Sequence, residues 1–305
     1  MERYILKRVG QALICLLGIT IIIFLLTRIS GDPVSLMVPP EATLKDIQAM
    51  RTSLGLDRPL YVQYWEYISG LMQGDFGNSI RWGTPCLDIF MERFPNTIIL
   101  SIAAMVFAVF VGIPVGILSA VYVERWFDKT GKIFALIGQS LPVFWLGIML
   151  MMIFSVNLGM LPTSGMGGWL HLIMPTITLG WYATASFTRL TRSSMLEVLD
   201  AEYIKMARIV GVSEFLVVWK NALKNAVLPI LTLGMANFIA LLNGAVITET
   251  VFNWPGVGRL VVDAVFTRDF PLVQTCVILA SALFIFANLF VDILYAYLDP
   301  RIRYQ

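Results

Sequence analysis

The chain has 305 residues, of which 58% are hydrophobic and only 14% charged, with a formal net charge of +2. A soluble protein of this size is about half apolar and about a quarter charged, so the composition indicates a membrane protein. The small net charge argues against nucleic-acid binding. The three cysteines, Cys15, Cys86 and Cys276, form no C-x-x-C pair and no Cys/His cluster. Neither a disulfide framework nor a structural zinc site is therefore predicted.

Six apolar runs are each long enough to cross about 30 Å of hydrocarbon, and they predict an all-α integral membrane protein. The first run is followed by no small-residue cleavage site, so we expect an uncleaved span that also serves as the insertion signal. The fourth run is diluted by Pro175 and several threonines, and its ends are the least defined. The six predicted spans are Val9–Ile29, Thr97–Tyr122, Ile133–Val156, Leu172–Thr188, Ile230–Val251 and Val273–Tyr295.

The distribution of lysine and arginine predicts the orientation of the chain. With the N-terminus in the cytoplasm, most of the basic residues lie on the cytoplasmic side, as the positive-inside rule requires. Both termini and the stretch Asp200–Pro229 are then cytoplasmic. The cytoplasmic basic residues are Arg3, Lys7, Arg8, Arg125, Lys129, Lys132, Arg189, Arg192, Lys205, Arg208, Lys220, Lys224, Arg301 and Arg303.

The outer segment between the first two spans, residues 31–96, is too long for a plain connector. A helical pattern begins at Leu44 and meets a natural stop at Gly55, and a second helix is predicted from Pro59. This second helix is rich in aromatic residues. Two interpretations stay open at this point. The helix either belongs to an interfacial aromatic belt that rests on the bilayer, or forms a small outer cap that contacts a delivered ligand or a partner protein.

Glycine and proline in the second span, at Gly112, Pro114 and Gly116, predict close approach of another helix. No catalytic constellation is present: the sequence has no G-x-x-x-x-G-K-[ST], H-E-x-x-H or G-x-S-x-G motif. The lone His171 is expected to be a polar cap rather than a metal ligand. Glu249 and Asp292 lie near span ends, so no row of carboxylates crosses the membrane and a proton-coupled mechanism is disfavoured.

The polar stretch Asp200–Pro229 is predicted to fold as a short helix, a turn and a second helix. Asp200 is expected to cap the first helix, and Gly211 to end it, since glycine reaches positive φ without steric cost. Ser213 is expected to start the second helix, and Pro229 to interrupt or redirect it. The stretch is interpreted either as an interfacial helix that caps a loop or as a docking helix for a soluble partner. The first helix has an apolar face made of Tyr203, Met206, Ala207 and Val210.

Several ordered motifs, spread over essentially the whole chain, give it a resemblance to a known family. The chain resembles inner-membrane permease subunits of ATP-binding-cassette (ABC) importers of the dipeptide, oligopeptide and nickel group, and permeases of glutathione importers are among the similar members. The motifs are Gly31–Pro33, Leu54–Tyr61, Gly74–Gly77, Tyr203–Arg208 with Gly211, Asn225 with Pro229, Phe252–Arg259, Arg268–Pro271 and Asp299–Arg303.

The resemblance implies a type I ABC importer permease fold with an extra helical segment outside the membrane. Residues 1–30 would form the N-terminal tip and first span, and residues 31–96 the periplasmic helical segment. Residues 97–295 would form a core of five transmembrane helices with a cytoplasmic coupling loop at 189–229, followed by a cytoplasmic tail at 296–305.

In this family the cytoplasmic stretch contains the coupling helix, which inserts into a groove of the ATPase subunit. The family's E-A-A-x-x-x-G pattern is matched here only by Ala207 and Gly211, because Lys205 and Met206 replace the usual Glu and Ala. Glu202 is the candidate to supply the missing carboxylate. The ATPase-coupling residues implied are Asp200, Glu202, Tyr203, Met206, Ala207, Arg208, Val210 and Gly211.

The resemblance also implies the partners: a homologous second permease, two ATPases that carry ATP and Mg, and a periplasmic solute-binding protein. No cofactor, no catalytic residue and no metal site is expected in this chain, and the sequence assigns no substrate-binding residue. Peptides or peptide-like solutes are preferred as cargo on family frequency, with nickel chelates or other small solutes as the alternative. An ATP-independent secondary transporter and an integral membrane enzyme are the remaining, weaker hypotheses.

Overall fold

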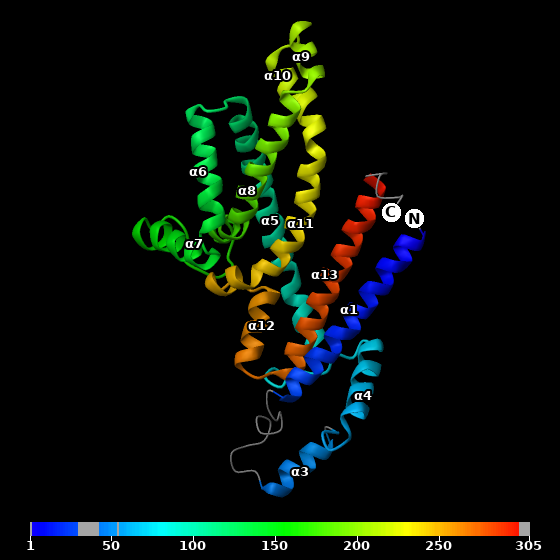
Figure 1. The fold of residues 1–305 in the computed structure, drawn as a ribbon. Coiled ribbons are helices and arrows are strands. Elements are labelled where there is room, and N and C mark those ends of the chain that lie inside the picture. Colours follow the sequence, from blue (N-terminus) through cyan, green and yellow to red (C-terminus); the bar gives the residue numbers. More distant parts are fainter. Residues whose placement is uncertain (1, 30–42, 54, 299–305) are drawn as a thin grey trace. The chain divides into compact units, whose positions relative to one another are not determined.

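The computed structural model describes residues 2–29, 43–53 and 55–298 (Figure 1). Within these residues all regular structure is helical, apart from an isolated bridge between Asn78 and Pro85. The motifs at Gly31–Pro33 and Asp299–Arg303 lie outside the described residues, as does Leu54. The chain divides into two compact units, which are treated separately: the first comprises residues 1–95 and 259–305, and the second Asn96–Gly258.

The first unit is built on α1 (Glu2–Ile29) and α13 (Phe270–Leu298), which pack along each other (Figure 1). Gln274 on α13 donates a hydrogen bond to the hydroxyl of Thr27 on α1, with 2.6 Å between the two atoms. The unit also contains α3 (Leu44–Ser53) and α4 (Leu60–Met72), as the sequence predicts. Between them Gly55 has the positive φ of +64° that its predicted role as a helix stop requires.

The buried carboxylate of Asp269 joins two of the sequence motifs within the first unit. It accepts hydrogen bonds from the Ser79 hydroxyl and from the backbone N–H groups of Ile80 and Arg81. Asp269 is 1% exposed, so these donors replace water around the charge. The loop that follows Gly74–Gly77 is therefore held against the turn Arg268–Pro271, although about 190 residues separate them.

The second unit is a helical bundle whose core lies between α5 (Cys86–Val121), α8 (Trp169–Leu199) and α11 (Leu223–Val251). Gly112 and Gly116 of α5 contact α8 so closely that a Cβ on either would lie 2.7 Å from a backbone oxygen, that of Thr184 or of Thr188. The predicted close approach at these glycines is confirmed. Besides most of α5, α8 and α11, the unit contains α6 (Trp126–Ser140), α7 (Val143–Leu150), the π-helix η1 (Met151–Asn157), α9 (Glu202–Ile209), α10 (Glu214–Leu216), the π-helix η2 (Val217–Ala222) and the start of α12 (Val257–Phe266).

Within the described part of the chain, four of the predicted spans fall on helices that are long and apolar enough to cross a membrane. The third predicted span, Ile133–Val156, is not one straight helix: α6 and α7 meet at a bend of 108° (Figure 1). The bend lies at Leu141 and Pro142, because proline forces the residue before it into an extended conformation and Leu141 has φ −78° and ψ 128°. The fourth predicted span lies within α8, which is long enough to cross a membrane but is not among the four sufficiently apolar helices. The count of six spans therefore stays a prediction.

Candidate functional site

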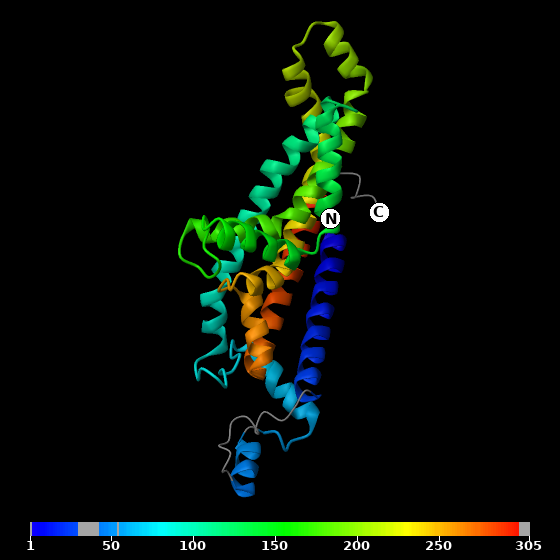
Figure 2. The same ribbon diagram turned by 90° about the vertical axis from the view of Figure 1, so that its left-hand side faces the viewer.

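The predicted coupling helix is α9, which with α10 forms a hairpin between the ends of α8 and α11 (Figure 2). Asp200 does not cap α9, contrary to the prediction. Ala201 is the N-cap residue without a side-chain hydrogen bond, and Asp200 is instead the C-cap residue of α8. The exposed carboxylate of Asp200 pairs with Lys205, with 3.0 Å between the charged atoms, and this pairing competes with capping.

Ile204, which the sequence analysis did not single out, anchors α9 to the second unit. It is fully buried in a cluster that includes Ile117 of α5, Met195 of α8 and Val217 of η2. Ala207 packs against the same cluster, so it lies on the inner face rather than with Tyr203, Met206 and Val210. The predicted apolar face is thus divided. Its small residue lies inward and lets α9 pack closely on the buried cluster, and its large residues lie outward.

The large apolar side chains exposed on the hairpin and on the adjoining helix η2 form what we call the apolar tip. Ile209, Val210 and Phe215 are each at least 70% exposed, which is unusual for apolar side chains at a surface that meets water. Only three of the seven members belong to the predicted coupling set. The apolar tip comprises Tyr203, Met206, Ile209, Val210, Phe215, Leu216 and Trp219.

Gly211 ends α9 as predicted. Its φ is +87°, its N–H donates to the carbonyl of Arg208, and the N–H of Val212 donates to the carbonyl of Ala207. These two bonds make up a Schellman motif, in which a left-handed residue closes the last turn of a helix. Ser213 then precedes α10, as expected. The chain reverses direction within four residues and presents Val210 and Phe215 on either side of the turn.

An ion pair spans this reversal. The guanidinium of Arg208 donates two hydrogen bonds to the carboxylate of Glu214, with donor–acceptor distances of 2.7 and 3.1 Å. These bonds raise the pKa of Arg208 above its usual value. Glu202, the predicted source of a carboxylate, forms no ion pair with another described residue. In the sequence, Arg208 and Glu214 lie on either side of the turn at Gly211. This pattern of opposite charges could have indicated Glu214 as a residue of the site.

The second half of the predicted loop is helical. Pro229, predicted to interrupt or redirect the second helix, lies inside α11, which continues to Val251. A proline in a helix removes one backbone hydrogen bond, and a long, packed helix tolerates that loss. Asn225, one turn earlier, donates a hydrogen bond to the Tyr203 hydroxyl at 2.8 Å and so ties α11 to α9.

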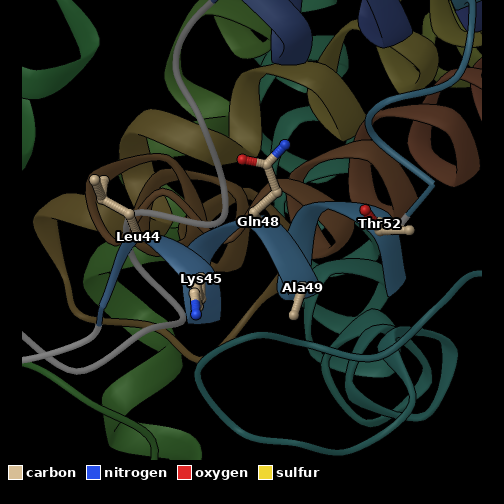
Figure 3. Close-up of a pocket in the computed structure, with 5 residues that line it drawn as sticks. All are labelled: Leu44, Lys45, Gln48, Ala49 and Thr52. Carbon is tan, nitrogen blue, oxygen red and sulfur yellow. The ribbon is translucent and has the colours of Figure 1, made fainter.

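The described residues contain no group of three His, Cys, Asp or Glu side chains placed to hold a metal ion. Figure 3 shows a pocket on α3 lined by Leu44, Lys45, Gln48, Ala49 and Thr52. All five residues come from a single helix, so they provide no opposing wall and we assign no substrate to this pocket.

Two family comparisons cover most of the chain. The family described as "Binding-protein-dependent transport system inner membrane component" matches residues 112–304, and its N-terminal counterpart matches residues 1–101. The glutathione transport system permease protein GsiC of Salmonella choleraesuis (strain SC-B67) is 45% identical over 306 residues, which is 100% of both chains. GsiC of Escherichia coli (strain K12) is 44% identical over the same length.

Solved structures share the fold at low sequence identity. A chain of the inward-facing MetNI methionine ABC transporter superposes with a TM-score of 0.59 at 18% identity, over 70% of this chain and 97% of that one. A chain of an amino acid ABC transporter with histidines gives a TM-score of 0.55 at 16% identity, over 70% of this chain and 94% of that one. At these identities the likeness shows the fold alone.

Proposed function

The chain belongs to the family of inner membrane components of binding-protein-dependent transport systems, and we propose that it forms half of the translocation pore of an ATP-driven importer for peptides or peptide-like solutes. The observation that carries this proposal is the 45% identity, over the full length of both chains, with a glutathione transport permease. The chain is a multi-pass inner membrane protein and a transport subunit. ATP hydrolysis belongs to a separate subunit.

Importers of this family combine permeases with ATPases and a solute-binding protein. For this chain we propose a homologous second permease, two ATPase subunits that bind ATP and Mg, and a periplasmic binding protein. The excess of lysine and arginine in the predicted cytoplasmic segments supports a cytoplasmic location for both termini.

The length of the helices supports docking of the hairpin to a soluble subunit. The continuous helical segment Glu214–Val251 has 38 residues and is therefore about 57 Å long, whereas the hydrocarbon core is about 30 Å thick. If Val251 marks one boundary of the membrane, the apolar tip stands about 25 Å beyond the other boundary. An interfacial helix would lie at the boundary itself, so the length favours the docking interpretation over the interfacial one.

The packing of the hairpin also suits it to transmit force. Ile204 is anchored in the core, Gly211 closes the turn, and the Arg208–Glu214 pair joins its two arms. If the hairpin moves as a rigid body with the ATPase to which it is docked, ATP binding and hydrolysis would shift the helical bundle between two conformations. Coupling would then be carried by packing rather than by a chain of charges.

The proposed substrate class is tested first on the solute-binding protein that works with this permease. Its thermal unfolding is measured with dipeptides, oligopeptides, glutathione and a nickel chelate, because a ligand that binds the folded state raises the unfolding temperature. We expect stabilisation by glutathione or peptides. ATP-dependent uptake of the same ligand into proteoliposomes that contain the full complex completes the test. Stabilisation by the nickel chelate alone would overturn the substrate class and leave the importer architecture in place.

A further inference from the structure

We propose that α4 is embedded in the membrane, alongside α1, and that its outward face contacts lipid acyl chains. In the proposed orientation this is the periplasmic leaflet. The sequence leaves open whether this aromatic helix rests on the bilayer or forms a cap in water. The packing of α4 within the first unit resolves the choice.

One face of α4 packs on the spanning helix α1. The Tyr64 hydroxyl lies 2.9 Å from the Thr20 hydroxyl, within hydrogen-bond distance. The rings of Tyr64 and Tyr67 contact Phe24, with centroids 5.4 and 5.8 Å apart, respectively. Both partners on α1 belong to an apolar segment, Arg8–Ile29, that is long enough to cross a membrane.

The positions of these contacts along α1 give the depth of α4. Phe24 lies five residues before Ile29, and Thr20 nine residues before it, so they are about 7 and 13 Å from that end of the helix. Amphipathic helices that lie in a membrane sink about 5–10 Å below the boundary between headgroups and acyl chains. A helix whose aromatic rings meet Phe24 lies at that depth, and a cap in water would instead contact residues at or beyond Ile29.

The outward face of α4 has the chemistry that lipid requires. Tyr61, Trp65 and Met72 fall on one stripe at helical spacing, and they are 76%, 72% and 84% exposed. No described residue of the first unit covers this stripe, and it carries no charge. Tyrosine and tryptophan are the side chains enriched where a protein meets the outer part of a membrane, because their rings are apolar and their polar atoms reach toward water.

Several polar groups of α4 have partners, whereas the Tyr67 hydroxyl and the side-chain oxygen of Gln63 are buried with no hydrogen-bond partner among the described residues. The amide of Gln63 is buried and donates to the carbonyls of Leu56 and Arg58, at 3.2 and 2.7 Å. The carboxylate of Glu66, the only charged side chain within α4, pairs with the guanidinium of Arg58. Arg58 precedes the helix and has a long side chain that can keep its charge near the headgroups. These pairings reduce the cost of placing the helix in an apolar medium.

Site-directed spin labelling of the full complex in lipid nanodiscs tests the proposal. Single cysteines are introduced by Tyr61→Cys and Trp65→Cys in a chain that carries Cys15→Ser, because Cys15 is the exposed native cysteine and Cys86 and Cys276 are buried. Each nitroxide is then tested for collisions with oxygen, which concentrates in lipid, and with a water-soluble nickel chelate. Gln48→Cys on the polar helix α3 is the water-facing control.

We expect labels at positions 61 and 65 to collide several times more often with oxygen than with the nickel chelate, and the label at position 48 to show the opposite ratio. Equal behaviour at positions 48, 61 and 65 would place α4 in water and overturn the proposal. Protection of positions 61 and 65 from both reagents would show that another protein subunit covers the stripe, and would also overturn it. Retained ATP-dependent uptake shows that a variant is folded. Because positions 61 and 65 are labelled separately, the test still stands if one of the two variants fails to fold.

Discussion

The carboxylate of Asp128 on α6 and the guanidinium of Arg192 on α8 form a two-bond ion pair, with donor–acceptor distances of 2.6 and 3.0 Å. Asp128 is fully buried, and it also accepts hydrogen bonds from Lys132 and from the backbone N–H of Glu124. Glu124 has a φ of +60°, so the carboxylate stabilises an unfavourable backbone conformation in the turn between α5 and α6. One acidic side chain therefore joins this turn to α8, the helix that leads to the hairpin.

We predict that Arg192→Met destabilises the protein by about 2–3 kcal/mol. The substitution leaves the Asp128 carboxylate buried with only Lys132 and the backbone N–H of Glu124 to stabilise its charge. The measurement is the midpoint of thermal unfolding of the purified chain in detergent. Lys132→Met is the matched control and should have a smaller effect, since Lys132 is 44% exposed and solvent screens its charge. An unchanged midpoint in Arg192→Met would show that the pair contributes little. The double variant Asp128→Asn, Arg192→Met should lose less stability than the two single effects added together.

The second prediction concerns the backbone at Gly211. A Cβ there would meet no atom within 4 Å, so the cost of adding one comes from the backbone conformation rather than from a clash. Gly211→Val places a branched residue at φ +87° and should cost at least about 1–2 kcal/mol locally, opening the turn between α9 and α10. We expect membrane insertion to persist and ATP hydrolysis to become uncoupled from uptake in proteoliposomes.

Gly211→Asn is the matched control, because asparagine visits the left-handed region more readily than other non-glycine residues. This variant should retain most of the uptake per ATP hydrolysed. Normal coupling in Gly211→Val would contradict the role proposed for the reversal. Equal loss in both variants would indicate that the absence of a side chain, rather than the backbone conformation, is what the position requires.

The third prediction concerns the apolar tip. Met206 is 60% exposed and Ile204 on the same helix is buried. Met206→Asp should leave the unfolding temperature of the isolated chain nearly unchanged, yet weaken co-purification of the ATPase subunits at least tenfold, because a charge would be buried in the docking groove. The control is Lys224→Asp, which introduces the same acidic side chain at an exposed position of α11 outside the apolar tip. It should have a much smaller effect on assembly. Unaltered assembly in Met206→Asp would exclude the tip from the contact.

These residues show which parts of the fold and site can be predicted from sequence. Gly211 was predictable because the conformation of a helix end is decided by a few neighbouring residues. Ile204 and Ala207 were not assigned to the inner face, because an eight-residue helix with apolar residues on several sides does not reveal which side meets the core. Glu214 was missed because its partner, Arg208, lies across a turn.

Proline gives the clearest example of tertiary control. Pro142 breaks the predicted third span, whereas Pro229 is accommodated within α11. The rule that proline disfavours helix holds for both, but the surrounding packing decides whether the chain bends or loses only one hydrogen bond. Contacts such as Asp128–Arg192, which join residues 64 positions apart, have no local signal at all.

The last prediction concerns Glu249, which is fully buried near the end of α11. It accepts a 2.6 Å hydrogen bond from the Thr97 hydroxyl, and Thr97 accepts one from the N–H of Val257. A Cβ at Gly256 would lie 2.2–2.4 Å from the carboxylate atoms, so the motif Phe252–Arg259 needs glycine there because Glu249 fills the space.

We therefore expect Gly256→Ala to lower the unfolding temperature clearly, at a cost of about 1–3 kcal/mol from overpacking. Gly244→Ala on α11 is the control: its Cβ would meet Leu179 at an ordinary 3.6 Å, and alanine favours helix, so this variant should be neutral or slightly more stable. Adding Glu249→Ala to Gly256→Ala removes the atoms that clash, so the double variant should be more stable than the sum of the single effects predicts. Strict additivity would mean that the carboxylate and the glycine act independently, and that the close contact between them does not explain the motif.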